Sequence, residues 1–178
     1  MKDSELKIVS QLMKDSRRSD REIAKAIGIS QPTVSRVISK LKKQGIIQQC
    51  TMIPDLSKMG FEIFALTFVA YSPETYKNYP EKTRIEKRDR FISEHHNIIF
   101  ASGGRGLGMG RVIMSVHRDY SDYNEFLKDF ESEWSELFNR IESFTVSLKT
   151  DTVTTVFSLK NLADYITKIG QTQHSTVS

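Results

Sequence analysis

Apolar positions follow two different periods along the chain and divide it into two parts. From residue 5 to residue 44 they recur every three or four positions, which is the period of an amphipathic helix. This pattern predicts helices over residues 5–14, 19–27 and 30–44. After residue 61, short runs rich in β-formers alternate with longer helical patterns. The front of the chain is therefore predicted to be helical and the remainder mixed.

The second and third predicted helices carry clear end signals. Ser19 and Glu22 have the Ser-x-x-Glu spacing in which each side chain caps the other's backbone N–H. Gly28 suits the left-handed conformation that ends a helix, and Gly45 is expected to end the third helix. Two short helices joined by so tight a turn predict a helix-turn-helix. Residues 46–53 look extended and are expected to add a β-wing.

The third helix should have one apolar and one polar, basic face. Val34, Val37, Ile38 and Leu41 fall on one arc and are expected to face the core. A basic face alone indicates only solvation, but the capping box, turn and extended segment together favour DNA binding. Placed in a major groove, the helix would offer Gln31, Thr33, Ser35 and Arg36 to bases, and Ser39, Lys40, Lys42 and Lys43 to phosphates. Ser30 and Pro32 complete the predicted DNA-binding set.

The second part predicts an α+β fold. Strands are expected at 61–71, 97–102, 111–117 and 143–149. One helix is expected between residue 80 and residue 95, and another over 120–140. In the last strand, Phe144, Val146 and Leu148 are expected to point inward, while 153–157 extends it or forms another strand. This β-α-β-β-α-β order is ferredoxin-like. The expected domains are 1–53, a linker over 54–60, a ferredoxin-like domain over 61–169 that includes a short helix at 161–169, and a flexible tail over 170–178.

The first predicted strand is apolar on both sides. Phe64, Leu66 and Phe68 alternate with a second apolar row, Ile63, Val69 and Tyr71. Helices in a ferredoxin-like fold cover one sheet face, so one row would be left in water. We therefore expect a homodimer, or a higher multiple of dimers, that forms through the sheet. Two-fold symmetry would in turn call for a pseudo-palindromic operator in double-stranded DNA.

The distribution of charge also divides the chain into two parts. The chain has a net charge of +4, yet residues 1–60 hold twelve Lys/Arg against six Asp/Glu. The basic excess therefore lies in the helical part, which is expected to face a polyanion. The N-terminus lacks the continuous apolar run of a signal peptide, so a cytoplasmic protein with no membrane partner is expected. The single cysteine, Cys50, excludes an internal disulfide and a multi-cysteine metal site.

At this level of detail the chain resembles the Lrp/AsnC family of prokaryotic regulators. The resemblance rests on Ser19-Asp20-Arg21-Glu22-Ile23-Ala24, on Ile27-Gly28-Ile29-Ser30 with Val34, on Ile38, Leu41 and Gly45-Ile46-Ile47, and on Gly60. It implies a sequence-specific transcriptional regulator in which a winged helix-turn-helix is joined to an effector and assembly domain. Family members carry a Gly-x-x-Asp stretch at the effector site, where this chain has Gly108-Met109-Gly110-Arg111. A guanidinium in place of a carboxylate predicts an anionic effector instead of an ordinary amino acid, held by Gly104, Gly106, Gly108, Gly110 and Arg111.

Other chemistry remains open in the sequence. The glycine run 103–110 indicates a flexible hairpin connection more than a phosphate cradle, since no helix follows it. Surface positions are favoured over a metal pair for His95, His96 and His117, and packing over redox sensing for Cys50. No catalytic pairing stands out, so no enzyme and no cofactor are expected. The alternatives are a metal- or redox-responsive regulator, or an enzyme that shares the architecture of the sirohaem decarboxylases.

Overall fold

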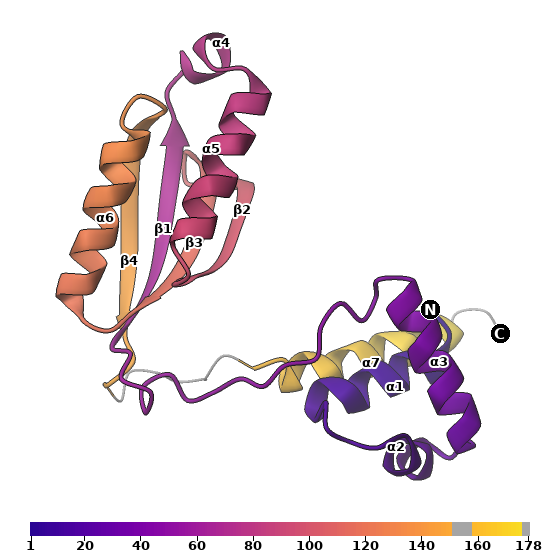
Figure 1. Cartoon of the computed structure of the whole chain (residues 1–178). Coiled ribbons are helices and arrows are strands. Elements are labelled where there is room, and N and C mark those ends of the chain that lie inside the picture. Colours follow the sequence, from indigo (N-terminus) through magenta and orange to yellow (C-terminus); the bar gives the residue numbers. More distant parts are fainter. Residues whose placement is uncertain (151–157, 176–178) are drawn as a thin grey trace. The chain divides into compact units, whose positions relative to one another are not determined.

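The computed structural model describes residues 1–150 and 158–175 and separates into two compact units. One unit contains residues 1–53 together with the C-terminal helix α7 (Lys160–Ser175), and the other runs from Pro54 through the last strand. Each unit has its own hydrophobic core, and Figure 1 shows the helices and strands of both units.

The helical unit begins with α1 (Asp3–Lys14), α2 (Asp20–Ile27) and α3 (Gln31–Lys43). Ile8, Ile23 and Val34, one from each helix, are fully buried at its centre. The predicted capping box is present, since Ser19 and Glu22 satisfy each other's backbone N–H groups. Gly28 ends α2 at φ +73°, a conformation that costs a residue with a Cβ about 1–2 kcal/mol. The predicted helix-turn-helix is therefore confirmed.

The expected β-wing is absent from the described residues. No strand is formed over 46–53; instead the backbone N–H groups of Ile46 and Ile47 both donate to the carbonyl of Leu41. These bonds fold the chain back onto the end of α3. A wing also needs a returning strand, and the chain goes on from Ile53 to Pro54 without one. Extended-looking composition was therefore insufficient to predict a β-wing here.

Helix α7 packs against α1 in the helical unit, where Ala163 is fully buried and Lys14 forms an ion pair with Asp164. The expectation that residues 161–169 belong to the sheet domain is therefore wrong. So is the expected tail from residue 170, because α7 runs to Ser175; residues 176–178 lie outside the described part. Periodicity identified a helix here, but periodicity does not say which core a helix joins.

The second unit has the predicted β-α-β-β-α-β order. Its elements are β1 (Ile63–Tyr71), a short α4 (Thr75–Asn78), α5 (Glu81–Glu94), β2 (Ile98–Gly106), β3 (Met109–His117), α6 (Tyr120–Trp134) and β4 (Phe138–Ser147). The strands form one antiparallel sheet in the order β2-β3-β1-β4. Helices α5 and α6 lie on the same face of this sheet (Figure 1). The predicted α+β, ferredoxin-like architecture is confirmed.

The junction between α6 and β4 differs from the prediction. Helix α6 was expected to reach residue 140 but ends at Trp134, and Phe138 already pairs with Tyr71 as the first residue of β4. The carbonyl of Leu137 accepts from both the Ser72 N–H and the Thr75 hydroxyl, which holds the connection in place. Phe138 still enters the core, but from a strand. The strand considered for 153–157 lies outside the described residues.

The two faces of the sheet are covered differently. On the helix side of β1, Ala65, Thr67 and Val69 are fully buried. On the other side, Leu66 pairs with Met114 in β3 and with Phe144 in β4, and Phe144 is 63% exposed. The expectation that Phe144 and Val146 point inward is therefore wrong, because alternation alone does not tell which face the helices cover. We call this helix-free surface the open face; it includes Phe64, Leu66, Phe68, Val112, Met114, Phe144 and Val146.

Candidate nucleic-acid interface

Helix α3 has the two-sided character that a recognition helix needs. Val34 and Leu41 are fully buried and fix the helix against the core, while Val37 and Ile38 pack against its edge. The opposite side is polar and open to solvent. Ser30, Gln31, Pro32, Ser35, Arg36, Ser39, Lys40, Lys42 and Lys43 are exposed, and Thr33 is half-buried. All ten residues predicted for DNA binding thus lie on α3 or its N-cap.

The start of α3 is held by local contacts. The hydroxyl groups of Ser30 and Thr33 are hydrogen-bonded at 2.8 Å, and the backbone N–H of Thr33 donates to the Ser30 carbonyl. Pro32 lies in the first turn, where its missing N–H removes no helical hydrogen bond. This end of the helix is therefore ordered before any contact with DNA, which lowers the entropic cost of binding.

Lys40 differs from the other lysines of α3. Its ammonium contacts Glu5 Oε1 of α1 at 2.7 Å, and the other oxygen of Glu5 accepts from the Lys2 backbone at 2.8 Å. The Lys40 hydrogen bond and the Lys2 backbone hydrogen bond hold the pKa of Glu5 below its usual value. Lys40 thus joins α3 to α1 across 35 residues of sequence, a contact that no local pattern could reveal. Lys42 and Lys43 form no ion pair within the described part of the chain.

The five residues proposed for the effector site lie along the β2–β3 hairpin, three of them exposed and two half-buried. Gly104, Gly106 and Gly108 are exposed at the end of the β2–β3 hairpin. The connection expected over 103–110 is shorter than predicted, because β2 runs to Gly106 and β3 begins at Met109. Gly110 lies under Tyr71, where an added Cβ would come within 3.2 Å of the ring. Arg111 Nε donates to the Tyr71 hydroxyl at 2.9 Å. Arg111 is thus directed at Tyr71 instead of at the hairpin tip.

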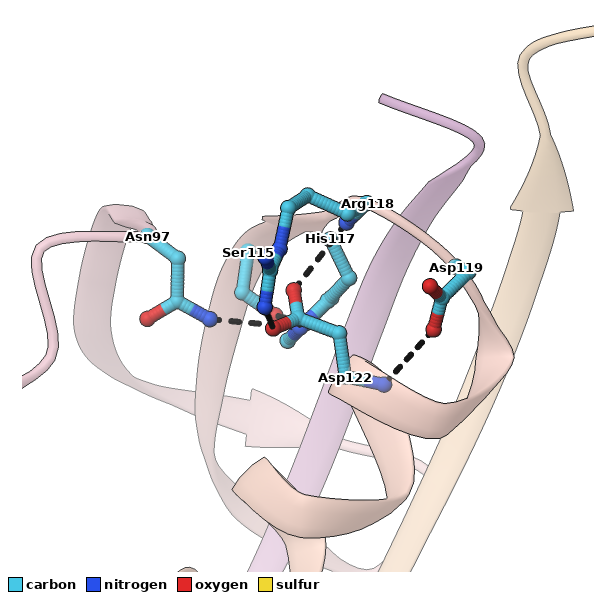
Figure 2. Close-up of polar contacts among 6 residues, drawn as sticks. All are labelled: Asn97, Ser115, His117, Arg118, Asp119 and Asp122. Atoms are coloured by element: carbon cyan, nitrogen blue, oxygen red, sulfur yellow. Dashed lines mark hydrogen bonds and ion pairs between the residues drawn. The ribbon is translucent and has the colours of Figure 1, made fainter. Parts of the chain in front are cut away.

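His117 is buried, not on the surface as expected. Its ring is fully buried at the end of β3, with Nε2 2.8 Å from Ser115 Oγ and Nδ1 3.2 Å from Asn97 Nδ2 (Figure 2). An amide nitrogen can only donate, so Nδ1 accepts and Nε2 carries the proton to Ser115. Burial lowers the pKa of His117, although the nearby Asp122 carboxylate opposes this shift. The imidazole is therefore neutral at pH 7.

The same cluster contains a Ser-His-Asp set that the sequence did not suggest. Asp122 Oδ2 lies 3.8 Å from His117 Nδ1 and accepts instead from the Arg118 backbone N–H, while Asp122 Oδ1 accepts from the Arg118 guanidinium (Figure 2). In a hydrolytic triad serine donates to Nε2, which is the reverse of the arrangement found here. Ser115 and His117 are both fully buried, so a substrate has no access to either. The cluster fixes the end of β3 against the start of α6.

The remaining candidates are dispersed. His95 Nδ1 contacts the Phe91 carbonyl and its ring stacks on Phe91, whereas His96 is exposed. Cys50 is also exposed, so the packing role expected for it is wrong. Within residues 1–150 and 158–175, no three His, Cys, Asp or Glu side chains are grouped to hold a metal ion. In the same part of the chain, no helix is long and apolar enough to cross a membrane.

The helix-turn-helix and its basic helix α3 define a DNA-binding protein, and comparison with known proteins agrees. The winged helix-turn-helix DNA-binding family matches residues 1–48. An uncharacterised HTH-type transcriptional regulator of Pyrococcus furiosus is 30% identical over 126 residues, which cover 71% of this chain and 78% of the relative. The HTH-type regulator LrpA of Pyrococcus horikoshii is 31% identical over 96 residues, 53% of this chain and 68% of LrpA.

Solved structures share the fold over most of the chain. A transcriptional regulator of Neisseria meningitidis, crystallised as a complex with L-Met, superposes with a TM-score of 0.70 at 17% identity and covers 91% of this chain and 99% of its own. At that identity the likeness concerns the fold alone. Together with the sequence relatives, it completes the assignment: the chain belongs to the Lrp/AsnC family of transcriptional regulators.

Proposed function

We propose that the protein regulates transcription by inserting α3 into the major groove of double-stranded DNA. The observation that carries this proposal is the exposed polar side of α3, opposite the buried Val34 and Leu41. Gln31, Thr33, Ser35 and Arg36 lie at the N-terminal half of the helix, which reaches base edges in helix-turn-helix proteins. Lys42 and Lys43 follow at its C-terminal end and would neutralise phosphates.

We propose further that the protein binds DNA as a homodimer formed through the open face. Two-fold pairing would bury Leu66, Met114 and Phe144 of each protomer, which α5 and α6 leave uncovered. It would also supply two copies of α3 for the two halves of a pseudo-palindromic operator. A tetramer or octamer built from such dimers would keep the same pairing.

A small-molecule effector would modulate this activity. The Neisseria regulator, which shares this fold, was crystallised as a complex with L-Met, and that complex supports the proposal. In this chain Arg111 favours an anionic effector over a zwitterionic amino acid. The chain's own role is regulatory and not catalytic, because the Ser115–His117 pair is buried and its Nε2 donates to the serine instead of accepting the serine proton. A protein that reads operators would work in the cytoplasm, with the chromosome.

The DNA proposal is tested by two substitutions on α3 that differ in their expected effect. With duplex DNA from its own promoter region, Arg36→Ala should cost about 1–3 kcal/mol of specific binding if Arg36 reads a base. Lys43→Ala should weaken all sequences alike and reduce the salt slope by about one. Lys77→Ala, which removes the same charge from the exposed end of α4, is the matched control. Unchanged anisotropy titrations for both α3 variants would remove the proposed interface.

A further inference from the structure

A cavity of about 200 Å³ lies between α5 and the sheet, inside one protomer. Its deep side is apolar and aromatic: Phe91, Ile113, Phe130, Trp134 and Phe138 are each at least nine-tenths buried. Tyr71 from β1 adds a half-buried ring that packs edge-on against Phe138. Aromatic side chains that line a concave space are the usual apolar surface of a small-molecule site.

The outer side of this cavity is cationic. Arg84 and Arg88 come from the face of α5 that also carries Phe91, and Arg111 comes from β3 beneath them. All three side chains are half-buried. Glu81 supplies the only carboxylate among the lining residues, and it is exposed at the start of α5. The cavity thus brings together three guanidinium groups and one carboxylate beside an aromatic floor.

Arg111 favours an anionic ligand in this cavity. Arg88 shares its charge with the adjacent Asp89, at 2.6 Å. Arg111 instead donates to the neutral hydroxyl of Tyr71, and no carboxylate in the described residues lies within ion-pair distance of it. A half-buried guanidinium without a counter-ion is costly, and an anionic ligand would offset that cost.

Trp134 provides a second, independent observation. The Trp134 side chain is only 5% exposed, and its indole Nε1–H has no hydrogen-bond acceptor in the described residues. Buried donors almost always find a partner, so an orphan beside a cavity indicates an acceptor that the protein does not itself supply. Arginine side chains can cover apolar surface with their aliphatic stems, and this alone would explain why Arg84 and Arg88 lie on this face of α5. It explains neither the empty space nor the unpartnered indole.

We propose that this cavity binds a small aromatic carboxylate, with its ring on the floor and its carboxylate toward Arg111 and the α5 arginines. The site lies within one protomer and does not include the glycines of the β2–β3 hairpin. The further claim that the ligand is an effector rests on the proposed function. The site also explains why α5, with few apolar residues, lies over the sheet with arginines on its inner side.

Trp134 is the only tryptophan of the chain and lines the cavity, so its fluorescence reports occupancy directly. The full-length protein is titrated, without DNA, with phenylacetate, phenylacetamide, phenethylammonium and acetate. The expected result is a saturable change in Trp134 emission and a higher melting temperature with phenylacetate. Phenylacetamide should bind at least about tenfold more weakly, since it lacks the charge-assisted contact. Phenethylammonium and acetate should produce no saturable change.

Arg111→Gln should weaken phenylacetate about tenfold and leave phenylacetamide unchanged. Arg90→Gln is the matched control, because Arg90 lies on α5 but pairs with Glu133 and does not line this cavity. Far-ultraviolet circular dichroism checks the fold of both variants. The ligand series on the unmodified protein tests the site independently of both variants. Equal binding of anion, amide and cation, or no saturable signal, would overturn the site.

The regulatory claim is measured separately, as the affinity for promoter DNA with and without phenylacetate. A change of affinity supports an effector site. Binding of phenylacetate that leaves DNA affinity unchanged overturns the effector claim alone and leaves the cavity's ligand class standing. Loss of the DNA-binding proposal would not alter the fluorescence result, because that titration contains no DNA.

Discussion

Phe144 offers the sharpest test of how the protein assembles. It lies on the open face, paired with Leu66 of β1, and is 63% exposed in the single chain. If two sheets pair through this face, each protomer buries its own Phe144 against the other. Phe144→Asp should therefore disrupt the dimer and leave the fold of the monomer intact, because the side chain contributes little to the protomer's own core.

The size of the effect follows from the exposed fraction. Full burial of a phenylalanine is worth about 1.5–3 kcal/mol, so burying the exposed 63% of Phe144 is worth about 1–2 kcal/mol per protomer. The two-fold interface contains the residue twice, which gives about 2–4 kcal/mol and raises the dimer Kd about 30- to 1,000-fold. Burial of two unpaired carboxylates would add to this cost.

The assay is sedimentation velocity across a concentration series, with circular dichroism to confirm the fold. Tyr120→Asp is the matched control, since Tyr120 is an aromatic residue with 61% exposure that lies at the start of α6, away from the open face. The control should remain dimeric. An unchanged dimer Kd for Phe144→Asp, in a folded protein, would refute pairing through the open face.

Three further results are expected. Because burial holds the pKa of His117 below the unfolded value near 6.5, the unfolded chain binds that proton more readily; the melting temperature should fall as pH drops below about 6.5, and less so in His117→Gln. Ser19→Ala removes the cap of α2 and should lower the free energy of unfolding by about 0.5–2 kcal/mol in urea titrations, whereas Ser16→Ala, outside the capping box, should not. Lys40→Ala should lower the melting temperature and change the salt slope of DNA binding less than Lys43→Ala, because Glu5 already engages its ammonium. Equal slopes for the two lysine variants would contradict that assignment.

Local sequence signals predicted the helical unit well because its helices end at residues with local causes. Ser19, Gly28 and Pro32 act on backbone groups within a few positions of themselves, so their effect can be read without knowing the fold. The prediction of the β-wing was wrong because a strand depends on more than local residues. A strand exists only with a partner, and residues 46–53 have none among the described residues.

Features that depend on distant contacts were missed. The Lys40–Glu5 pair joins residues far apart in sequence, and α7 packs on α1 although its periodicity fits either unit. Alternation in β4 was visible, yet only the placement of α5 and α6 shows that Phe144 faces away from them. In the candidate effector site, Arg111 stood out by its charge, but Arg84, Arg88 and Trp134 join it only through packing of α5 on the sheet.

The most direct test of the central claim is selection of binding sites by the full-length protein from a library of random DNA duplexes. A dimer that reads DNA with two copies of α3 should enrich an imperfect palindrome whose half-sites lie about one helical turn, or a multiple of it, apart. Each half-site should hold the bases that Gln31, Thr33, Ser35 and Arg36 can reach. Enrichment of a single asymmetric half-site, or of no sequence at all, would contradict this account.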